Sequence, residues 1–564
     1  METKNCQNCK KDFVIEPEDF NFYEKIKVPV PTFCPECRNM QRMATRNVKS
    51  LYKKECDLCK KSVISRFSPN NPARMYCRDC WWGDGWDAMS FGKEYDFSKT
   101  FFEQFKELLF IVPHVSLLSS NMTESDYSNM ESDGKRCYLT FGGHYNEDCA
   151  FTEYCLWGRE VYDSYWAFKS EQCYQCLLIE RCYRTFYSQQ CYDCLDTYFS
   201  YDCSNCSNII GCAGLRNKSY CIFNQQYSHK EFLKIKDSFN LSSKKGVLEL
   251  LEKSKKVWLG FPHKESLITH SNNCSGNSVV NSKNSKNIYQ ADQVEDSKYV
   301  YIGAWNKNCY DETSTGNNEL TYMCANGGGL YNCIAVLYSF GSDVVKKKNA
   351  FDCQYSYTVL NCNDCFGCVG LRNKQYCILN KQYTKEEYFK LLEKIKKEML
   401  VNPFKSQKTG QVFSYGDFFP SEHSLFSYNE TVANDFYPKT KEEVEKAGFI
   451  WREEPETNYD FSDYDILDDI KDVDDSILSK VLKCEKSGKG YKIINQEFTF
   501  YKKMGIPIPR ISPLARIKDR IYLLLPFKLF ARQCQKCYKD IQTPYAPERP
   551  EIVYCEKCYQ QEVY

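Results

Sequence analysis

The chain has 564 residues, which is too long for one ordinary hydrophobic core and predicts two to four domains. Its formal net charge is only +1, so net charge favours no class of partner. An apolar leader and any long apolar run are missing from the sequence, which argues against export and membrane insertion and predicts a cytoplasmic protein. In a reducing compartment, 34 cysteines indicate metal ligands or buried thiols rather than disulfides.

Residues 1–97 are predicted to form an N-terminal double zinc ribbon. Each ribbon has two CxxC pairs, namely Cys6, Cys9, Cys34 and Cys37 in the first and Cys56, Cys59, Cys77 and Cys80 in the second. Two such turns on facing hairpins supply four thiolates at tetrahedral corners, which closes a zinc site and leaves no position for a substrate. The pairs are separated by 24 and 17 residues, against about 15 to 20 in typical ribbons. Structural zinc is therefore predicted at both sites, with buried free thiols as the alternative.

Basic and aromatic residues surround these two ribbons. The basic ones are Arg38, Arg42, Arg46, Lys49, Lys53, Lys54 and Lys60. Such clusters often bind nucleic-acid phosphate, because each neutralised phosphate releases counterions, and an ordinary solvated face is the alternative. A tryptophan group can stack on bases, but we favour packing of the ribbon onto neighbouring phenylalanines. The residues are Trp81, Trp82 and Trp86, with Phe101, Phe102 and Phe105 as expected partners.

The middle of the chain is predicted to contain two cysteine-rich β-repeat halves, residues 98–228 and 265–383. Cysteines recur there at intervals of nine, as at Cys173, Cys182 and Cys191, and a short fixed period is typical of a stacked repeat. We expect a β-solenoid with turns of about 18 residues, in which cysteine is a small apolar filler beside tyrosine. Further metal sites and a disulfide or redox role are the alternatives.

The two halves are copies of each other. The motif Gly-Leu-Arg-Asn-Lys, followed by Tyr-Cys-Ile, starts at Gly214 and again at Gly370, an offset of 156 residues. Each copy ends in a capping box, Ser228 with Glu231 and Thr384 with Glu387, where hydroxyl and carboxylate satisfy free amides at a helix start. A helical connector is therefore expected at residues 229–264 and a capping helix at 384–400.

An iron–sulfur cluster is a further alternative for the second copy. Cys362, Cys365 and Cys368 resemble the start of a ferredoxin run. That run needs a fourth cysteine where Arg372 stands, and the first copy has Ile209 in place of Cys365. These two departures argue against a cluster.

Residues 401–477 are predicted to be a mixed helical and acidic linker. A short helix is expected at Thr440–Glu443, with Gly448 as its stop. The acidic stretch at 453–475 is interpreted as a solvated tether, because it has neither the glycine nor the last glutamate of a calcium loop. Its charge also allows it to fold back on the basic ribbon segments and compete with an anionic partner.

The C-terminal ribbon module, residues 478–564, repeats the N-terminal one at an offset of 478 residues. The offset carries the second quartet onto Cys534, Cys537, Cys555 and Cys558, which are separated by 17 residues and predict a third zinc site. It carries the first quartet onto Cys484, Ser487, Ser512 and Ala515, so that ribbon is degenerate. Three zinc ions are therefore predicted. Basic residues again lie nearby, at Arg516, Lys518, Arg520, Lys528 and Arg532.

Several motifs resemble a family of long, multi-ribbon, cysteine-rich proteins of candidate phyla radiation bacteria. They are Phe-Cys-Pro-Glu-Cys-Arg from Phe33, the repeated Gly-Leu-Arg-Asn-Lys, Phe-Ser-Tyr-Asn-Glu-Thr-Val-Ala from Phe426, and Tyr-Ala-Pro-Glu-Arg-Pro-Glu-Ile-Val-Tyr-Cys from Tyr545. The resemblance covers nearly the whole chain. It implies zinc ribbons and an intracellular setting but no activity, because the family is functionally uncharacterised.

The sequence as a whole predicts a mainly β, multidomain protein with terminal zinc ribbons flanking a duplicated, solenoid-like middle with short capping helices. The usual catalytic and nucleotide-binding motifs are missing from the sequence, and it contains only six histidines. We expect a binding or scaffold protein that grips RNA or a ribonucleoprotein through its basic ribbon segments. The alternatives are a protein-interaction scaffold that uses the solenoid face, and a cysteine-dependent enzyme or metal-handling protein.

Overall fold

The computed structural model describes residues 1–339, 349–455 and 457–563. The described chain divides into two compact units that each combine segments distant in the sequence. The first unit contains residues 1–116, 266–453 and 526–529, and the second contains 117–265, 454–525 and 530–564. Each unit thus joins ribbons from one end of the chain to one half of the cysteine-rich middle. The predicted mainly β class is confirmed, because each unit contains one large sheet.

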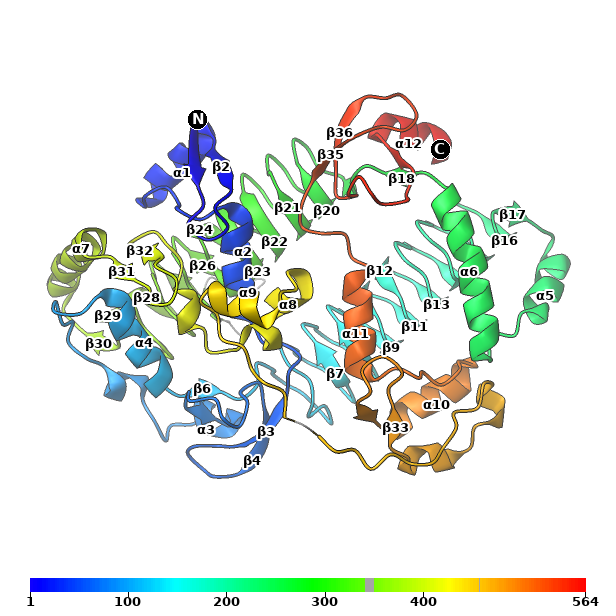
Figure 1. The fold of residues 1–564 in the computed structure, drawn as a ribbon, viewed down its shortest axis with the longest axis horizontal. Coiled ribbons are helices and arrows are strands. Elements are labelled where there is room, and N and C mark those ends of the chain that lie inside the picture. Colours follow the sequence, from blue (N-terminus) through cyan, green and yellow to red (C-terminus); the bar gives the residue numbers. More distant parts are fainter. Residues whose placement is uncertain (340–348, 456, 564) are drawn as a thin grey trace. The chain divides into compact units, whose positions relative to one another are not determined.

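The middle segment of the second unit, residues 117–226, forms a stack of short parallel strands that we call the first stack (Figure 1). Residues pair with those 12 positions later, as Thr185 does with Thr197. The predicted turn of about 18 residues is therefore wrong. The strands are β7 (Tyr138–Phe141), β8 (Ala150–Glu153), β9 (Arg159–Tyr162), β10 (Tyr165–Phe168), β11 (Glu171–Tyr174), β12 (Leu177–Glu180), β13 (Tyr183–Phe186), β14 (Leu195–Tyr198), β15 (Ser207–Ile210), β16 (Ser219–Ile222) and an antiparallel β17 (Gln225–Gln226).

The 12-residue turn is built from triplets of residues. From Tyr145 to Asn208, every third residue has a left-handed backbone, with φ between 46° and 59°. That conformation costs L-residues roughly 1–2 kcal/mol each, but here it aims the N–H group at a neighbouring turn. Tyr154, for example, donates its N–H to the carbonyl of Phe141 at 2.8 Å. The next residue of each triplet points into the stack, so all interior positions are separated by multiples of three.

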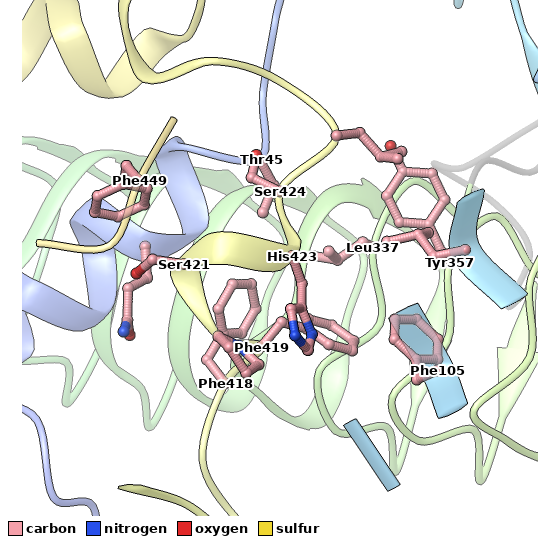
Figure 2. Close-up of a pocket in the computed structure, with 14 residues that line it drawn as sticks. Thr45, Phe105, Leu337, Tyr357, Phe418, Phe419, Ser421, His423, Ser424 and Phe449 are labelled. Carbon is pink, nitrogen blue, oxygen red and sulfur yellow. The ribbon is translucent and has the colours of Figure 1, made fainter. Parts of the chain in front are cut away.

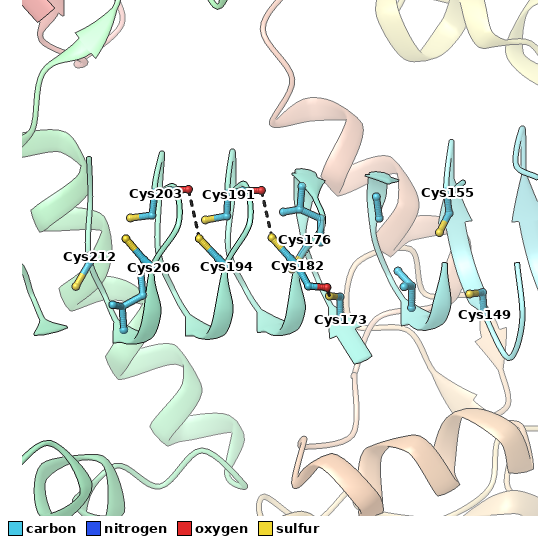
Figure 3. Packing of buried hydrophobic residues seen from close by; sticks show 14 of the residues in the cluster. Cys149, Cys155, Cys173, Cys176, Cys182, Cys191, Cys194, Cys203, Cys206 and Cys212 are labelled. Carbon is cyan, nitrogen blue, oxygen red and sulfur yellow. Dashed lines mark hydrogen bonds between the residues drawn. The ribbon is translucent and has the colours of Figure 1, made fainter. Parts of the chain in front are cut away.

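This triplet explains the cysteine interval of nine. Nine residues are three triplets, so cysteines at that spacing all lie at interior positions, where they are 0–2% exposed. Figure 3 shows them in rows along the first stack. Their thiols donate to carbonyls nine residues later, from Cys182 to Cys191 at 3.3 Å and from Cys194 to Cys203 at 3.5 Å. A narrow interior favours a small side chain that can also satisfy a carbonyl group.

The second stack, residues 266–382 of the first unit, follows the same register. Val279 pairs with Ala291, again 12 positions later, and a longer step of 20 separates Leu330 from Ala350. Its strands are β19 (Ile268–Thr269), β20 (Gly276–Val280), β21 (Ile288–Asp292), β22 (Lys298–Ala304), β23 (Lys307–Gly316), β24 (Glu319–Tyr322), β25 (Ala325–Gly328), β26 (Leu330–Tyr331), β27 (Ala350–Phe351), β28 (Cys362–Phe366), β29 (Gln375–Ile378) and an antiparallel β30 (Lys381–Gln382).

Helices follow each stack where the capping boxes predicted them. Ser228 and Thr384 each accept the N–H of the glutamate three residues later, at the starts of α5 (His229–Ser238) and α7 (Lys385–Val401). The connector also contains α6 (Lys244–Gly260), which runs beside the first stack and buries Trp258 (Figure 1). The helix predicted from Thr440 is confirmed as α9 (Lys441–Lys446), and α8 (Val432–Phe436) precedes it.

The acidic stretch is more than a solvated tether. Its side chains are largely exposed, but Asp468 and Asp469 accept hydrogen bonds from Ser243 and Ser242 at 2.5 and 2.7 Å, at the start of α6. Earlier in the stretch, the carbonyl of Ile466 accepts a bond from Arg510 in the degenerate ribbon. The segment therefore packs along the second unit.

Each stack carries ribbons on one face through matching contacts. In the first unit Arg38 and Arg42 pair with Asp311 at 2.9 and 3.3 Å, and the ring of Phe22 stacks on Tyr310 at 3.9 Å. In the second unit the residues at an offset of 478 do the same: Arg516 and Arg520 pair with Asp163 at 2.9 and 3.0 Å, and Phe500 stacks on Tyr162 at 4.0 Å. The carboxylates are completely buried. These contacts fix where the ribbons present their metal sites.

Candidate metal centres

The three predicted cysteine quartets each converge on one point. In each quartet the four sulfur atoms lie within 4.8 Å of one another: Cys6, Cys9, Cys34 and Cys37; Cys56, Cys59, Cys77 and Cys80; and Cys534, Cys537, Cys555 and Cys558. Four thiolates at this separation can hold one metal ion, and the donor set suits zinc. Within the part of the chain that the structure describes, the stack cysteines form no such group, and this includes Cys362, Cys365 and Cys368.

Each centre is built from one hairpin and one helix, not from two facing hairpins as predicted. The first CxxC pair lies in the turn of a two-stranded hairpin, and the second pair lies at the N-terminus of a helix. Cys34 is the N-cap of α2 (Pro35–Met43) and Cys77 that of α3 (Arg78–Trp82), while Cys555 directly precedes α12 (Glu556–Val563). The hairpins are β1 (Glu2–Asn5) with β2 (Asp12–Ile15), β3 (Tyr52–Glu55) with β4 (Ser62–Ser65), and β35 (Phe530–Gln533) with β36 (Asp540–Thr543).

The helix position has an electrostatic reason. Free N–H groups and the dipole at a helix N-terminus stabilise thiolates, which are the form that binds metal. The backbone N–H of Cys34 donates to the sulfur of Cys6 at 3.2 Å, and Cys77 and Cys555 donate to Cys56 and Cys534 at the same distance.

All three of these thiols have a lowered pKa, and that of Cys6 is lowered by hydrogen bonds from Cys34 and Cys37. Burial opposes ionisation of Cys534, but N–H groups of Cys537, Cys555 and Lys536 outweigh it and lower its pKa to about 6. Burial likewise opposes ionisation of Cys56, and N–H groups of Cys59, Cys77 and Leu58 lower its pKa to about 7. These thiols can therefore lose their protons near neutral pH when a metal ion binds.

The degenerate ribbon keeps the same frame without the ligands. Its hairpin is β33 (Leu482–Lys483) with β34 (Gly490–Tyr491), and its helices are α10 (Asn495–Met504) and α11 (Pro513–Tyr522). The sulfur of Cys484 accepts the N–H of Ser512 at 3.2 Å, as Cys6 does from Cys34. One thiol cannot hold a metal ion in the way that four can, so the predicted number of three sites is supported.

A fifth hairpin of this kind was not foreseen. β31 (Phe404–Lys405) and β32 (Val412–Phe413) enclose a turn in which Ser406 donates its N–H to Gln411 and accepts that of Gly410, both at 2.9 Å. Cys6 makes the same two bonds with Lys11 and Lys10. Ser406 and Thr409 stand where the CxxC turn has cysteines. The CxxC pair is what predicts such a hairpin from sequence, and this hairpin has no cysteines. Only Gly410, directly after the turn, could have indicated it.

The predicted basic residues fall into three groups. The buried arginines are at most 7% exposed and comprise Arg38, Arg42, Arg46, Arg516 and Arg520. Lys53, Lys60, Lys518 and Lys528 are exposed, while Lys49, Lys54 and Arg532 are half-buried and bonded to Asp435, Asn71 and Ala546. The buried arginines hold the ribbons onto the stacks, so a nucleic-acid role rests on the exposed lysines.

The tryptophans beside the second ribbon form their own cluster. Trp81 is 1% exposed and contacts Trp82 and Trp86, with ring centroids 4.7 and 5.9 Å apart. Arg372 of the Gly-Leu-Arg-Asn-Lys motif lies over all three rings at 5.2 to 5.8 Å. They therefore anchor the ribbon to the end of the second stack rather than to the expected phenylalanines of α4 (Phe101–Ile111).

An apolar cavity in the first unit offers no substrate site. Figure 2 shows Phe105, Tyr357, Phe419 and His423 around it. Its volume is about 30 Å³, which is room for about two water molecules. Burial and the charge of Lys106 lower the pKa of His423 to about 3, so its ring is neutral.

Comparisons with known proteins add no relative. No family model matches the chain, and no curated protein matches its sequence. Among the described helices, we find none with the length and apolar character needed to cross a bilayer. The chain is thus characterised by its own features: three four-cysteine centres that can hold metal ions, and two large parallel sheets.

Proposed function

We propose that the protein is a zinc-stabilised binding protein, with one structural zinc ion in each of the three cysteine centres. The observation that carries this is the closed set of four thiols, which leaves no open position for catalysis. The cysteines are all free thiols, which fits a reducing, cytoplasmic setting. We further propose that both stacks are β-solenoids with 12-residue turns, and that the chain belongs with the multi-ribbon proteins of candidate phyla radiation bacteria that its motifs resemble.

We infer that the ribbons bind RNA, alone or in a ribonucleoprotein. Exposed lysines follow or lie within the first CxxC turn of every centre: Lys10 and Lys11, Lys60 and Lys61, and Lys536 and Lys539. The predicted Lys53 and Lys518 extend this exposed set. A metal-closed turn fixes the backbone that carries these lysines, so that binding of phosphate costs little backbone ordering. RNA affinity should therefore fall steeply with salt.

Fluorescence anisotropy of a labelled single-stranded RNA at several salt concentrations tests this proposal. Exchanging Lys10, Lys60 and Lys61 for glutamate should weaken binding and reduce the salt slope by about 0.7 for every phosphate that the protein no longer neutralises. Lys256→Glu on α6 is the control, because Lys256 is 75% exposed but lies away from the ribbons in the sequence. Binding that is absent in the wild type, or indifferent to salt, would refute the proposal.

A protein-interaction scaffold is the second candidate, and one observation favours it. Tyr183 and Leu195 pair on an outer side of the first stack and are 38% and 42% exposed. Tyr331 and Phe351 pair at the corresponding place of the second stack and are 38% and 39% exposed. Matching apolar pairs on two stacks fit a partner with two similar binding elements. Capture of a partner that Tyr183→Ser abolishes in nuclease-treated protein would support this candidate.

A further inference from the structure

Two half-exposed tryptophans lie at corresponding places in the two stacks. Trp157 is 45% exposed and Trp305 is 43% exposed. They differ by 148 positions, which is also the separation of Tyr162 from Tyr310 and of Asp163 from Asp311. Those two pairs make the matching docking contacts described above, so the tryptophans occupy equivalent positions.

Neither tryptophan is fully buried by the stack that carries it. Both residues have a left-handed backbone, with φ of 53° and 55°, which favours asparagine or aspartate over a bulky aromatic residue. Along the same edge of the first stack, Asp193, Asn205 and Asn217 follow this preference, whereas Tyr145, Lys169 and Arg181 do not. Slightly more than half of each side chain is buried, which offsets the cost of that backbone conformation. The rest of each ring stays in water and is open to a ligand.

The surroundings of Trp157 suit a flat, anionic ligand. The ring of Tyr145, 55% exposed, stacks on Trp157 with centroids 5.6 Å and planes 18° apart. Phe168 meets Trp157 edge-on at 5.4 Å. The ammonium group of Lys169 lies 5.9 Å from the centre of the Trp157 ring and 5.2 Å from that of Phe168. No carboxylate among the described residues pairs with Lys169, so its charge is available.

We propose that Trp157 and Trp305 are stacking sites for bases of single-stranded RNA, with Tyr145 and Lys169 completing the first site. This inference deepens the proposed function and rests on it. Aromatic rings accept any base, because every base has a π face, and a nearby cation binds the phosphate backbone. The two sites would add sequence-tolerant contacts to those of the ribbon lysines, in contrast to a site that reads base edges.

The double variant Trp157→Ala/Trp305→Ala tests the proposal in the full-length, metal-loaded protein. Affinity for labelled oligouridine and oligoadenine should fall roughly fivefold to hundredfold for each tryptophan that stacks. The phenylalanine double variant should keep most of the affinity. Phe389→Ala, which removes a 42% exposed aromatic side chain from α7, is the control and should bind as the wild type does. Thermal unfolding of each variant shows whether it is folded under the conditions of the binding assay.

The outcomes separate this inference from the proposed function. If the alanine variant binds RNA within twofold of the wild type while the lysine variants are weakened, the stacking sites are wrong and the ribbon function stands. If the reverse holds, the ribbon contacts are wrong. Quenching of tryptophan fluorescence by a neutral hexasaccharide but not by RNA would show that the rings bind sugars and would overturn the inference. A wild type that binds no RNA refutes both.

Discussion

The first ribbon and its degenerate counterpart differ in metal ligands but not in structure. Both have the hairpin, both bind a sulfur atom to a helix N-terminus at 3.2 Å, and both dock on a stack through two arginines and one buried aspartate. Only the first has four converging thiols. Docking on a stack can therefore hold a ribbon in place after its metal site has disappeared. Metal removal, exchange of the docking aspartates and restoration of the fourth centre test this conclusion.

Metal removal should produce the largest difference. Strong chelation should open residues 1–43 to hydrogen exchange, because structural zinc contributes about 10–16 kcal/mol to such small folds. Residues 482–522 should keep their protection, since no metal holds them. Hydrogen exchange with mass spectrometry measures both regions in one sample, and Cys484→Ser should leave metal content unchanged. Protection of residues 1–43 that survives chelation would contradict this prediction and show that docking alone also holds the first ribbon.

Exchange of the buried aspartates should have the next largest effect. Asp311→Asn leaves the buried Arg38 and Arg42 without a counter-ion, at a cost of about 3–5 kcal/mol. Asp163→Asn leaves Arg520 without one, while Arg516 keeps its pair with Glu497 at 3.3 Å. The penalty should be greater for the degenerate ribbon, which has no metal as a second support. Denaturant unfolding gives the values, with Asp193→Asn as the control because its exposed pair with Arg181 is worth under about 1 kcal/mol. A small effect at Asp163 would contradict the docking argument.

A buried glutamate should make the second stack sensitive to pH. Burial raises the pKa of Glu312 from 4.5 to about 7, and its donors Asn318, Thr321 and Cys324 only partly offset that. The folded protein thus keeps a proton that the unfolded chain loses, so stability is highest below pH 4.5 and falls as pH rises to about 7. The loss is about 3 kcal/mol.

Unfolding free energies at pH 5 and pH 8 check this effect. The decrease between them should shrink in Glu312→Gln, which cannot ionise. Glu131 in the first stack, whose pKa burial also raises to about 7, should contribute a similar slope that remains. A variant with the slope of the wild type would show that Glu312 does not carry the effect.

Restoring the fourth centre should change stability by a similar amount, in the opposite direction. Ser487→Cys, Ser512→Cys and Ala515→Cys together complete a quartet with Cys484, so elemental analysis should find four metal ions for every chain instead of three. The gain is about 3 kcal/mol when free metal exceeds its dissociation constant a hundredfold. Ser406→Cys/Thr409→Cys is the control, because that hairpin has no second pair and should add no ion. Three ions in the restored variant would mean that the backbone of the degenerate ribbon no longer brings four cysteines to one metal ion.

The metal centres could be predicted because their chemistry is local. A CxxC pair has to supply two thiols from one turn, so the spacing survives in the sequence. The helix that carries the second CxxC pair of each centre was not predicted. Pro35, directly after Cys34, is a common signal for a helix start.

The stacks were predicted less well for a physical reason. Cysteines do recur every nine residues, but nine residues are three triplets and not half of a turn. Spacings of 12, as from Cys182 to Cys194 and Cys206, indicated the turn directly. The buried roles of Arg38 and Arg516 depend on aspartates more than 270 positions away, and no local pattern shows such a partner.

The crossed pairing of ribbons and stacks has a consequence for synthesis on the ribosome. The first stack is finished at about residue 226, but the ribbons that cover it belong to residues 478–564. At a typical rate of 5–20 residues per second, the aromatic face on which these ribbons dock stays exposed for roughly 15–50 seconds until the ribbons are synthesised. A nascent chain of this kind has to be kept from aggregating by a chaperone, or by temporary docking of the N-terminal ribbons in the place later taken by their C-terminal counterparts.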